Sequence, residues 1–139
     1  MIVLDANVIS ESLRRAPDPH VIEWIDAQPI ETLYLSAISV AELRFGIAAL
    51  PEGRRREGLQ TNLETRILPR FAGRVLPFDL VASQAYGELM SRARAAGAAI
   101  PVADGYIAAT AVSRRMAVAT RDTAPFHTAG VAVVNPWTA

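Results

Sequence analysis

Acidic residues stand at the points where a predicted strand ends or a predicted helix begins: Asp5, Glu42, Asp104 and Asp122. In an alternating strand–helix protein these points converge on one edge of the sheet, where open α/β folds bind their ligands. A cluster of carboxylates repels itself unless protons or metal ions neutralise it. Because oxygen-only ligands favour Mg²⁺ or Mn²⁺, the pattern predicts metal-assisted catalysis with phosphate esters as the substrate class.

Each acid also has a structural alternative. Asp5 follows an apolar run directly and could cap the helix after it. Glu42 could complete a capping box opened by Ser39. Asp104 lies in the first turn of a predicted helix, where the helix dipole favours an acid, and Asp122 could start a turn. Four separate structural roles at four converging positions would be a coincidence, so the sequence favours one shared site.

The elements that must position these acids alternate along the chain. Short apolar runs predict five strands, near residues 1–5, 32–36, 74–78, 116–120 and 131–135. Helical patterns between them predict helices near residues 6–15, 21–28, 39–50, 52–68, 80–96 and 102–115. Right-handed crossovers place such helices on both faces of a parallel sheet. We therefore predict a single three-layer α/β domain over residues 1–139, with a parallel sheet of about five strands.

The composition excludes several classes of function. The chain has 139 residues, which suit one compact domain, and it has no Cys. Disulfides, thiolate zinc sites and thiol catalysis are therefore excluded. The start lacks a basic segment, and no window approaches the roughly 18 apolar residues of a membrane span. We expect a cytoplasmic protein. His20 and His127 lie far apart and neither has a partner at metal-ligand spacing.

The basic residues are unusual in kind, because all 14 are Arg and none is Lys. The net charge is zero, so the composition does not indicate a strong nonspecific nucleic-acid binder. Among the arginines, Arg121 is the candidate for binding a substrate phosphate because it neighbours Asp122. Other candidates crowd the polar helix and the turn after it: Arg54, Arg55, Arg56, Arg66, Arg70 and Arg74. Further candidates lie elsewhere in the chain: Arg14, Arg15, Arg114 and Arg115.

With the acidic residues in this order, the chain resembles the PIN-domain ribonucleases. It is most similar to the VapC-type toxins of bacterial type II toxin–antitoxin systems, including the FitB branch. The resemblance covers essentially the whole chain. It is carried by four segments: IVLDANVISE at 2–11, SAISVAEL at 36–43, PVADGYIAATA at 101–111 and ATRD at 119–122. No single motif is specific, but the ordered set at these separations is.

The resemblance implies a five-stranded parallel PIN fold and Mg²⁺- or Mn²⁺-dependent endonucleolytic cleavage of specific RNA, such as tRNA or rRNA, by metal-activated water. The four acids would then be catalytic and metal-binding, while Asn7 and Thr120 would hold the carboxylates and water in place. It also implies neutralisation by a small cognate VapB-type antitoxin, through which a larger assembly would reach operator DNA. A homodimer is expected, and residues 24–50 are rich in apolar side chains that a partner could cover.

Two positions depart from the family pattern. Ala6 stands where Thr or Ser is common, and Pro125 precedes Phe126 where a further acid is common. The main alternative is a PIN-like module that binds RNA or protein without catalysis, although such relatives usually lack one or more of the acids. Receiver domains and haloacid-dehalogenase-like phosphatases are disfavoured because both rely on a Lys.

Overall fold

The computed structural model describes all of residues 1–139 and contains one parallel sheet of five strands. The strands are β1 (Ile2–Leu4), β2 (Leu33–Ser36), β3 (Val75–Leu76), β4 (Ala117–Ala119) and β5 (Val133–Val134). Their order across the sheet is β3-β2-β1-β4-β5. This arrangement confirms the predicted parallel α/β architecture. The strands are shorter than the apolar runs because only the residues that pair with a neighbouring strand belong to the ladder.

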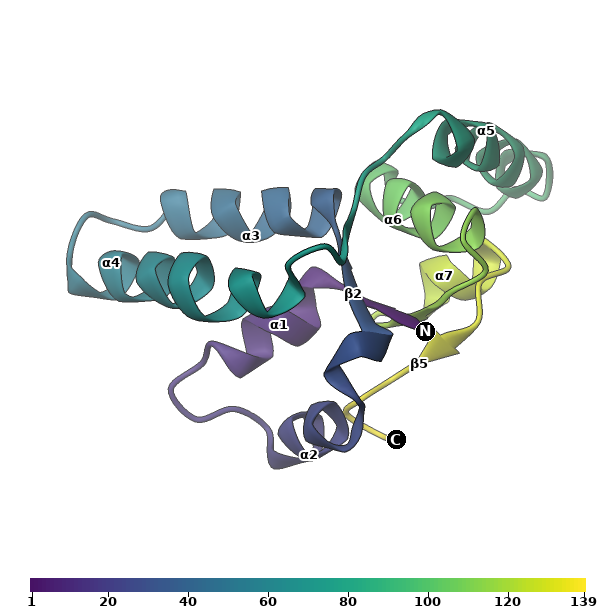
Figure 1. The fold of residues 1–139 in the computed structure, drawn as a ribbon. Coiled ribbons are helices and arrows are strands. Elements are labelled where there is room, and N and C mark those ends of the chain that lie inside the picture. Colours follow the sequence, from purple (N-terminus) through teal and green to yellow (C-terminus); the bar gives the residue numbers. More distant parts are fainter.

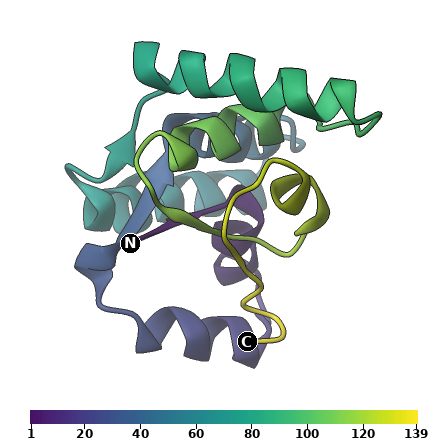
Figure 2. The ribbon, with the colours of Figure 1, turned by 90° about the vertical axis from the view of Figure 1, so that its right-hand side faces the viewer.

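Helices lie on both faces of the sheet, as Figures 1 and 2 show. They are α1 (Ala6–Ser12), α2 (Pro19–Ala27), α3 (Ala37–Ala48), α4 (Arg54–Thr61), α5 (Leu80–Ala95), α6 (Val102–Val112) and α7 (Ala124–Thr128). Beyond α4 the coil widens to a π-type segment (Asn62–Ile67) and then tightens to a 3₁₀ turn (Leu68–Phe71), while a second 3₁₀ turn (Ile30–Thr32) precedes β2. No helix is both long and apolar enough to cross a membrane.

Of these helices, only α7 has no counterpart in the sequence prediction. Its five residues are too few to show a helical period. Pro125 also suggests a break, although proline is well tolerated in the first turn of a helix because no backbone donor is needed there.

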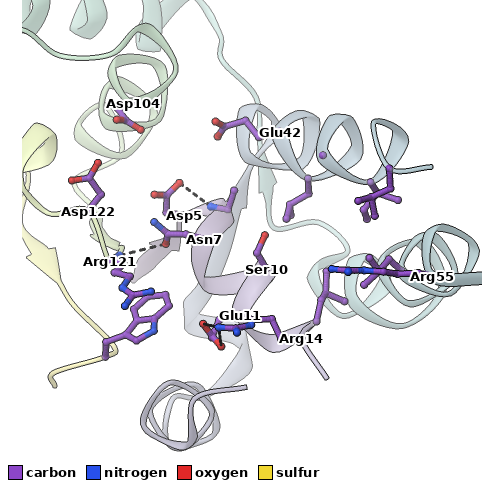
Figure 3. A pocket seen from close by; sticks show the side chains of 18 residues that line it. Asp5, Asn7, Ser10, Glu11, Arg14, Glu42, Arg55, Asp104, Arg121 and Asp122 are labelled. Atoms are coloured by element: carbon purple, nitrogen blue, oxygen red, sulfur yellow. Dashed lines mark hydrogen bonds and ion pairs between the residues drawn. The ribbon is translucent and has the colours of Figure 1, made fainter. Parts of the chain in front are cut away.

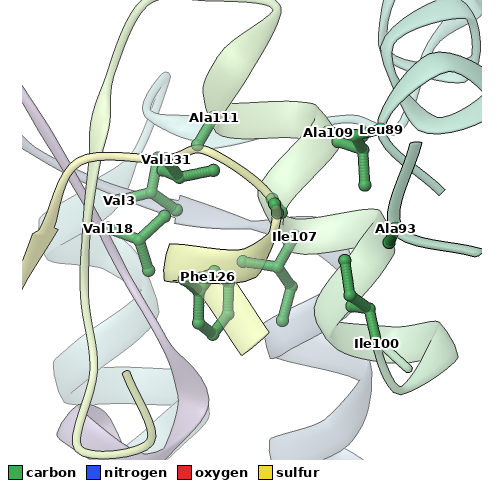
Figure 4. Packing of buried hydrophobic residues seen from close by; sticks show 12 residues of the cluster. Val3, Leu89, Ala93, Ile100, Ile107, Ala109, Ala111, Val118, Phe126 and Val131 are labelled. Carbon is green, nitrogen blue, oxygen red and sulfur yellow. The ribbon is translucent and has the colours of Figure 1, made fainter. Parts of the chain in front are cut away.

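Successive residues of the central strands point to opposite faces of the sheet, and this alternation divides the core in two. On one face, Val3 and Val118 pack with residues of α5, α6 and α7, and all these residues belong to the cluster in Figure 4. Leu4 and Leu35 pack on the other face against residues of α1, α2 and α3. Strands that are buried on both faces read as continuous apolar runs, so the sequence revealed their positions but not which face each side chain takes.

The start of α3 corrects one of the alternatives for Glu42. Ser36, the last residue of β2, caps the helix, and its hydroxyl accepts a hydrogen bond from the Ser39 amide at 3.0 Å. The predicted capping box needed Ser39 as the cap. It is wrong because the helix begins three residues earlier, which leaves Glu42 well inside the helix and free of a capping role.

The order of the strands determines where a ligand can bind. From β1 the chain first builds β2 and β3 on one side, and then β4 and β5 on the other side of β1. The carboxyl ends of β1 and β4 therefore flank the point at which the order reverses. In open α/β sheets the connections diverge at such a point and leave a crevice in which ligands bind.

We expect the replacement of a buried core side chain to lower the stability of the protein far more than the same replacement at the surface. Phe126 is fully buried, whereas Phe45 is 75% exposed. Replacing Phe126 by Ala should lower the free energy of unfolding by about 3–5 kcal/mol, and the same replacement of Phe45 should change it by less than about 0.5 kcal/mol. Urea unfolding followed by circular dichroism measures both changes. Equal losses for the two variants would contradict this description of the core.

Candidate active site

The structure brings all four predicted acids to one cavity of about 710 Å³, shown in Figure 3. Asp5 follows β1 and Asp122 follows β4, so these two residues flank the reversal point of the sheet. Glu42 projects from α3 and Asp104 from the first turn of α6. Residues separated by up to 117 positions thus face a common space, and the predicted convergence is confirmed.

Asp5 is the buried member of the set, with only 6% of its surface exposed. One carboxylate oxygen accepts a hydrogen bond from the Ala6 amide at 2.8 Å, and the other accepts one from the Thr120 hydroxyl at 2.8 Å. Asp5 therefore does cap α1, as its structural alternative proposed, and also faces the cavity. A single carboxylate fulfils both roles because its two oxygens have different partners.

Thr120 connects Asp5 to the rest of the site. Its fully buried hydroxyl donates to Asp5 and accepts hydrogen bonds from the Asn7 side-chain amide and the Asp122 backbone amide, both at 3.1 Å. The Asn7 carbonyl oxygen in turn accepts from the Arg121 backbone amide at 3.4 Å. These bonds place Asn7 and Thr120 beside the carboxylates, where the family resemblance puts them, and join the end of β1 to the segment after β4.

The carboxylates disfavour one another's charge. Burial, together with the charges of Asp5 and Asp122, raises the pKa of Asp104 to about 6. Glu42 stands at the exposed rim, yet partial shielding from water and the charges of Asp5 and Asp104 raise its pKa. Burial also raises the pKa of Asp5, although its hydrogen bonds from Thr120 and Ala6 oppose the shift. Such perturbed acids in a cavity are typical of functional sites.

The donor set fits a hard divalent cation. The side chains of Glu42, Asp104 and Asp122 accept no hydrogen bond and pair with no arginine, so their oxygens are free. As they are arranged here, no three acidic side chains form a group that could hold a metal ion without side-chain movement. A cation that balances their repulsion would lower all the raised pKa values together.

The cavity also contains residues that the sequence did not single out as site residues. Trp137, near the carboxyl terminus, lies under the Arg121 guanidinium at 5.2 Å from the ring centroid. This contact holds the arginine at the cavity. Buried Glu11 also lines it, and accepts hydrogen bonds from Arg14 at 3.3 Å and from the Asp18 amide at 3.1 Å. Nothing in the local sequence around Trp137 could have placed it here.

The fold and the site together define an α/β protein with a carboxylate cluster at the carboxyl edge of a parallel sheet. The PIN domain profile matches residues 2–131. The chain is 62% identical to the VapC ribonuclease Y4jK of Sinorhizobium fredii, with 99% of this chain and 98% of that protein covered. It is 53% identical to the toxin FitB of Neisseria gonorrhoeae, with 99% of both covered.

A solved structure agrees over the full length. The crystal structure of FitAcB from Neisseria gonorrhoeae superposes with a TM-score of 0.96 at 52% identity, and the match covers 100% of each chain. The chain belongs to the PIN domain family, in the branch that contains the VapC and FitB toxins. The predicted PIN fold is therefore confirmed, and the chain is a homologue of a VapC ribonuclease.

Removing the Thr120 hydroxyl should weaken metal binding at the site without creating a cavity in the core. Val has nearly the same shape as Thr, but it cannot donate to Asp5 or accept from Asn7. We expect Thr120→Val to lower the affinity for Mn²⁺ by roughly 10–100-fold, measured by isothermal titration calorimetry. Thr120→Ser keeps the hydroxyl and should lose much less. Equal affinities for the Val variant and the native chain would contradict the role assigned to this hydroxyl.

Neutralising Asp104 should stabilise the metal-free protein. An acid whose folded pKa is raised from 3.8 to about 6 destabilises the fold fully above pH 6, and this penalty fades as the pH falls from about 6 to 4. At pH 7.5 in EDTA we expect Asp104→Asn to raise the free energy of unfolding by on the order of 1 kcal/mol, after allowance for solvent screening. At pH 4 the gain should be absent.

Chemical denaturation at both pH values measures this effect. Asp26→Asn is the matched control, because Asp26 is exposed and lies outside the cavity. It should change stability at neither pH. A loss of stability in Asp104→Asn at pH 7.5 would show that the carboxylate is compensated within the protein, and would remove the electrostatic argument for a cation.

Proposed function

We propose that this chain is a Mg²⁺- or Mn²⁺-dependent endoribonuclease that acts as the toxin of a VapBC-type toxin–antitoxin pair. The observation that carries the proposal is the cavity in which four carboxylates meet without a basic partner for any of them. Similarity to a VapC ribonuclease and to the toxin FitB over nearly the whole chain supports it.

In the proposed mechanism Asp5, Glu42, Asp104 and Asp122 would hold one or two cations. The cation would supply activation of water for attack on phosphorus and stabilisation of the leaving oxygen. Thr120 and Asn7 keep Asp5 and the segment after β4 in a fixed arrangement, so the carboxylates need little reorganisation. Because the raised pKa of Asp104 leaves it partly protonated near pH 6, Asp104 would release its proton when it holds a cation.

Arg121 is the residue proposed to bind a phosphate of the substrate. It follows β4, lines the cavity beside Asp122, and is held there by Trp137. Its guanidinium forms no ion pair with any acid of the site, so its donors can reach a phosphate oxygen. We propose specific sites in tRNA or rRNA as the substrate, in keeping with the family resemblance.

The proposal includes its partners. A cognate VapB-type antitoxin would neutralise the nuclease in the cytoplasm and connect it to operator DNA, and the toxin itself would form a homodimer. Two side chains within residues 24–50, Ile30 at 36% and Phe45 at 75% exposure, are apolar and open to a partner. Others lie at the starts of α5 and α6, including Leu80 at 88% exposure.

Induction of the chain in bacteria, followed by mapping of RNA 5′ ends, tests the activity directly. We expect new ends at a few discrete sites, seen with the native chain and absent with Asp5→Asn, because the variant loses the buried charge that faces the cavity. Growth should stop only with the native chain. Identical profiles and unimpaired growth, given soluble protein, would favour the alternative of a catalytically silent module.

The metal requirement needs a separate experiment with purified chain and the RNA so identified. Cleavage should stop in EDTA and return with Mg²⁺ or Mn²⁺. Glu42→Gln and Asp104→Asn should each lower the rate by at least about 100-fold while the variants remain folded. Cleavage that persists in EDTA would overturn the metal-dependent mechanism even if the end-mapping experiment succeeds.

A further inference from the structure

We propose that a second groove, lined by Arg14, Arg15, Arg54 and Arg55, binds the sugar-phosphate backbone of the RNA next to the cleaved phosphate. This proposal rests on the proposed ribonuclease function and extends it. The four arginines are referred to below as the arginine groove. Arg14 and Arg15 follow α1, and Arg54 and Arg55 begin α4. Figure 3 shows Arg14 and Arg55 on the side of the cavity away from Asp104 and Asp122.

The arginine groove is continuous with the acidic cavity. It has a volume of about 1030 Å³, and four of its lining residues also line the cavity that holds the acids: Leu13, Arg14, Arg55 and Leu59. A chain molecule that enters one space can therefore extend directly into the other. Its four arginine side chains are positively charged, and no acidic side chain lines the groove.

These charges are not compensated within the protein. Arg15, Arg54 and Arg55 form no ion pair, and only Arg14 has one, with Glu11 at 3.3 Å. Glu52, just before α4, and Glu57, in the first turn of α4, do not line the groove. Although the net charge of the chain is zero, the acids gather in one space and four arginines gather in the adjoining one, with Arg14 and Arg55 where the two meet. The arginine groove therefore attracts an anion.

Stability does not account for the positions of Arg54 and Arg55. Both lie in the first turn of α4, where the helix dipole disfavours positive charge. Gly53 precedes them and offers no side chain to cap the helix. The placement is unfavourable for the helix, so a ligand is the better explanation for it. The proposed binding groups are the guanidinium side chains and not the amides of the helix.

The structure also separates these arginines from others that the sequence offered as candidates. Arg114 donates to Asp79 and to the Pro77 carbonyl, and so holds α6 to the segment before α5. Arg74 donates to the Leu33 carbonyl at 3.0 Å, which ties the approach to β3 to β2. These two side chains serve the fold. Those of the arginine groove have no comparable structural role, apart from the contact between Arg14 and Glu11.

RNA backbone is the occupant that best fits both spaces together. A phosphodiester chain can place one phosphate at the acids, with a cation between them, only if its other phosphates lie elsewhere, because bare carboxylates repel them. The arginine groove adjoins the acidic cavity and offers positively charged guanidinium groups to those phosphates. Guanidinium groups bind phosphate oxygens through paired hydrogen bonds. An acidic protein segment is the competing occupant, and the test below includes it.

The test uses the full chain with Asp5→Asn, which prevents cleavage, and a fluorescein-labelled 12-nucleotide oligouridylate as the probe. Backbone binding is independent of sequence, so this probe is sufficient. Fluorescence anisotropy between 50 and 200 mM salt gives the dissociation constant and its salt dependence. For single strands each phosphate contact contributes about 0.7 to the slope of log K against log salt.

We expect Arg54→Gln with Arg55→Gln to reduce this slope by about 1.4, and Arg15→Gln to reduce it by about 0.7. The double variant should also weaken binding at 50 mM salt by roughly tenfold or more. The matched control is Arg92→Gln with Arg94→Gln, which removes the same charge from exposed positions of α5 outside both spaces. It should leave the slope unchanged. Thermal melting of every variant checks that it remains folded.

With Asp5 intact, the double variant should cleave the mapped RNA with a raised KM and a nearly unchanged kcat, since the arginine groove binds RNA away from the reacting phosphate. An unchanged slope would overturn the inference, as would equal losses in the control or no binding by the Asp5→Asn chain at 50 mM salt. The groove is assigned to an acidic peptide instead if a 12-residue polyglutamate binds through these arginines while their replacement leaves RNA binding unchanged.

Failure of the proposed function has a different signature. In that case the native chain with Mg²⁺ would leave RNA intact, although the Asp5→Asn chain could still bind the oligouridylate with the expected dependence on the arginines. That combination would keep the arginine groove as an RNA-binding site on a protein without nuclease activity.

Discussion

The hydrogen bond from Thr120 to Asp5 joins the ends of β1 and β4, the two strands that flank the reversal point of the sheet. It is the contact on which the site depends. A buried carboxylate would otherwise be costly, and here the bond satisfies one oxygen while the Ala6 amide satisfies the other. The same hydroxyl receives the Asp122 amide, so the position of a second acid follows from the bond that secures the first.

The remaining charges are held in place by the fold and are not neutralised by it. Glu42 and Asp104 are carried into the cavity by α3 and α6, which pack on opposite faces of the sheet. No arginine approaches either carboxylate closely enough to pair with it. An arginine paired with these carboxylates would stabilise the protein, yet it would also occupy the oxygens that the proposed metal ion would need. The raised pKa values are the energetic consequence of keeping those oxygens free.

Much of this arrangement could be predicted from the sequence, because the strand ends carry the acids and parallel strands place their ends at one edge. Periodicity located six of the seven helices and all five strands. Long-range packing set the rest. The capping role of Ser36 depends on where β2 ends, and the stack of Arg121 on Trp137 joins residues 16 positions apart through a turn that no local pattern encodes. The metal-binding roles of the acids and the extent of the domain stay predictions.

Under the proposed function, the acidic cavity and the adjoining arginine groove would have complementary roles. The acids would repel phosphate unless a divalent cation were bound, whereas the arginine groove would attract phosphate with or without it. An RNA held only by the arginines would therefore be bound without its reacting phosphate lying among the carboxylates. Under the proposed function, placing the reacting phosphate among the carboxylates would require the cation, so the last step of substrate binding and the chemistry would depend on the same ion. If both proposals hold, a protein of zero net charge would discriminate between RNA that is merely bound and RNA that is placed for cleavage.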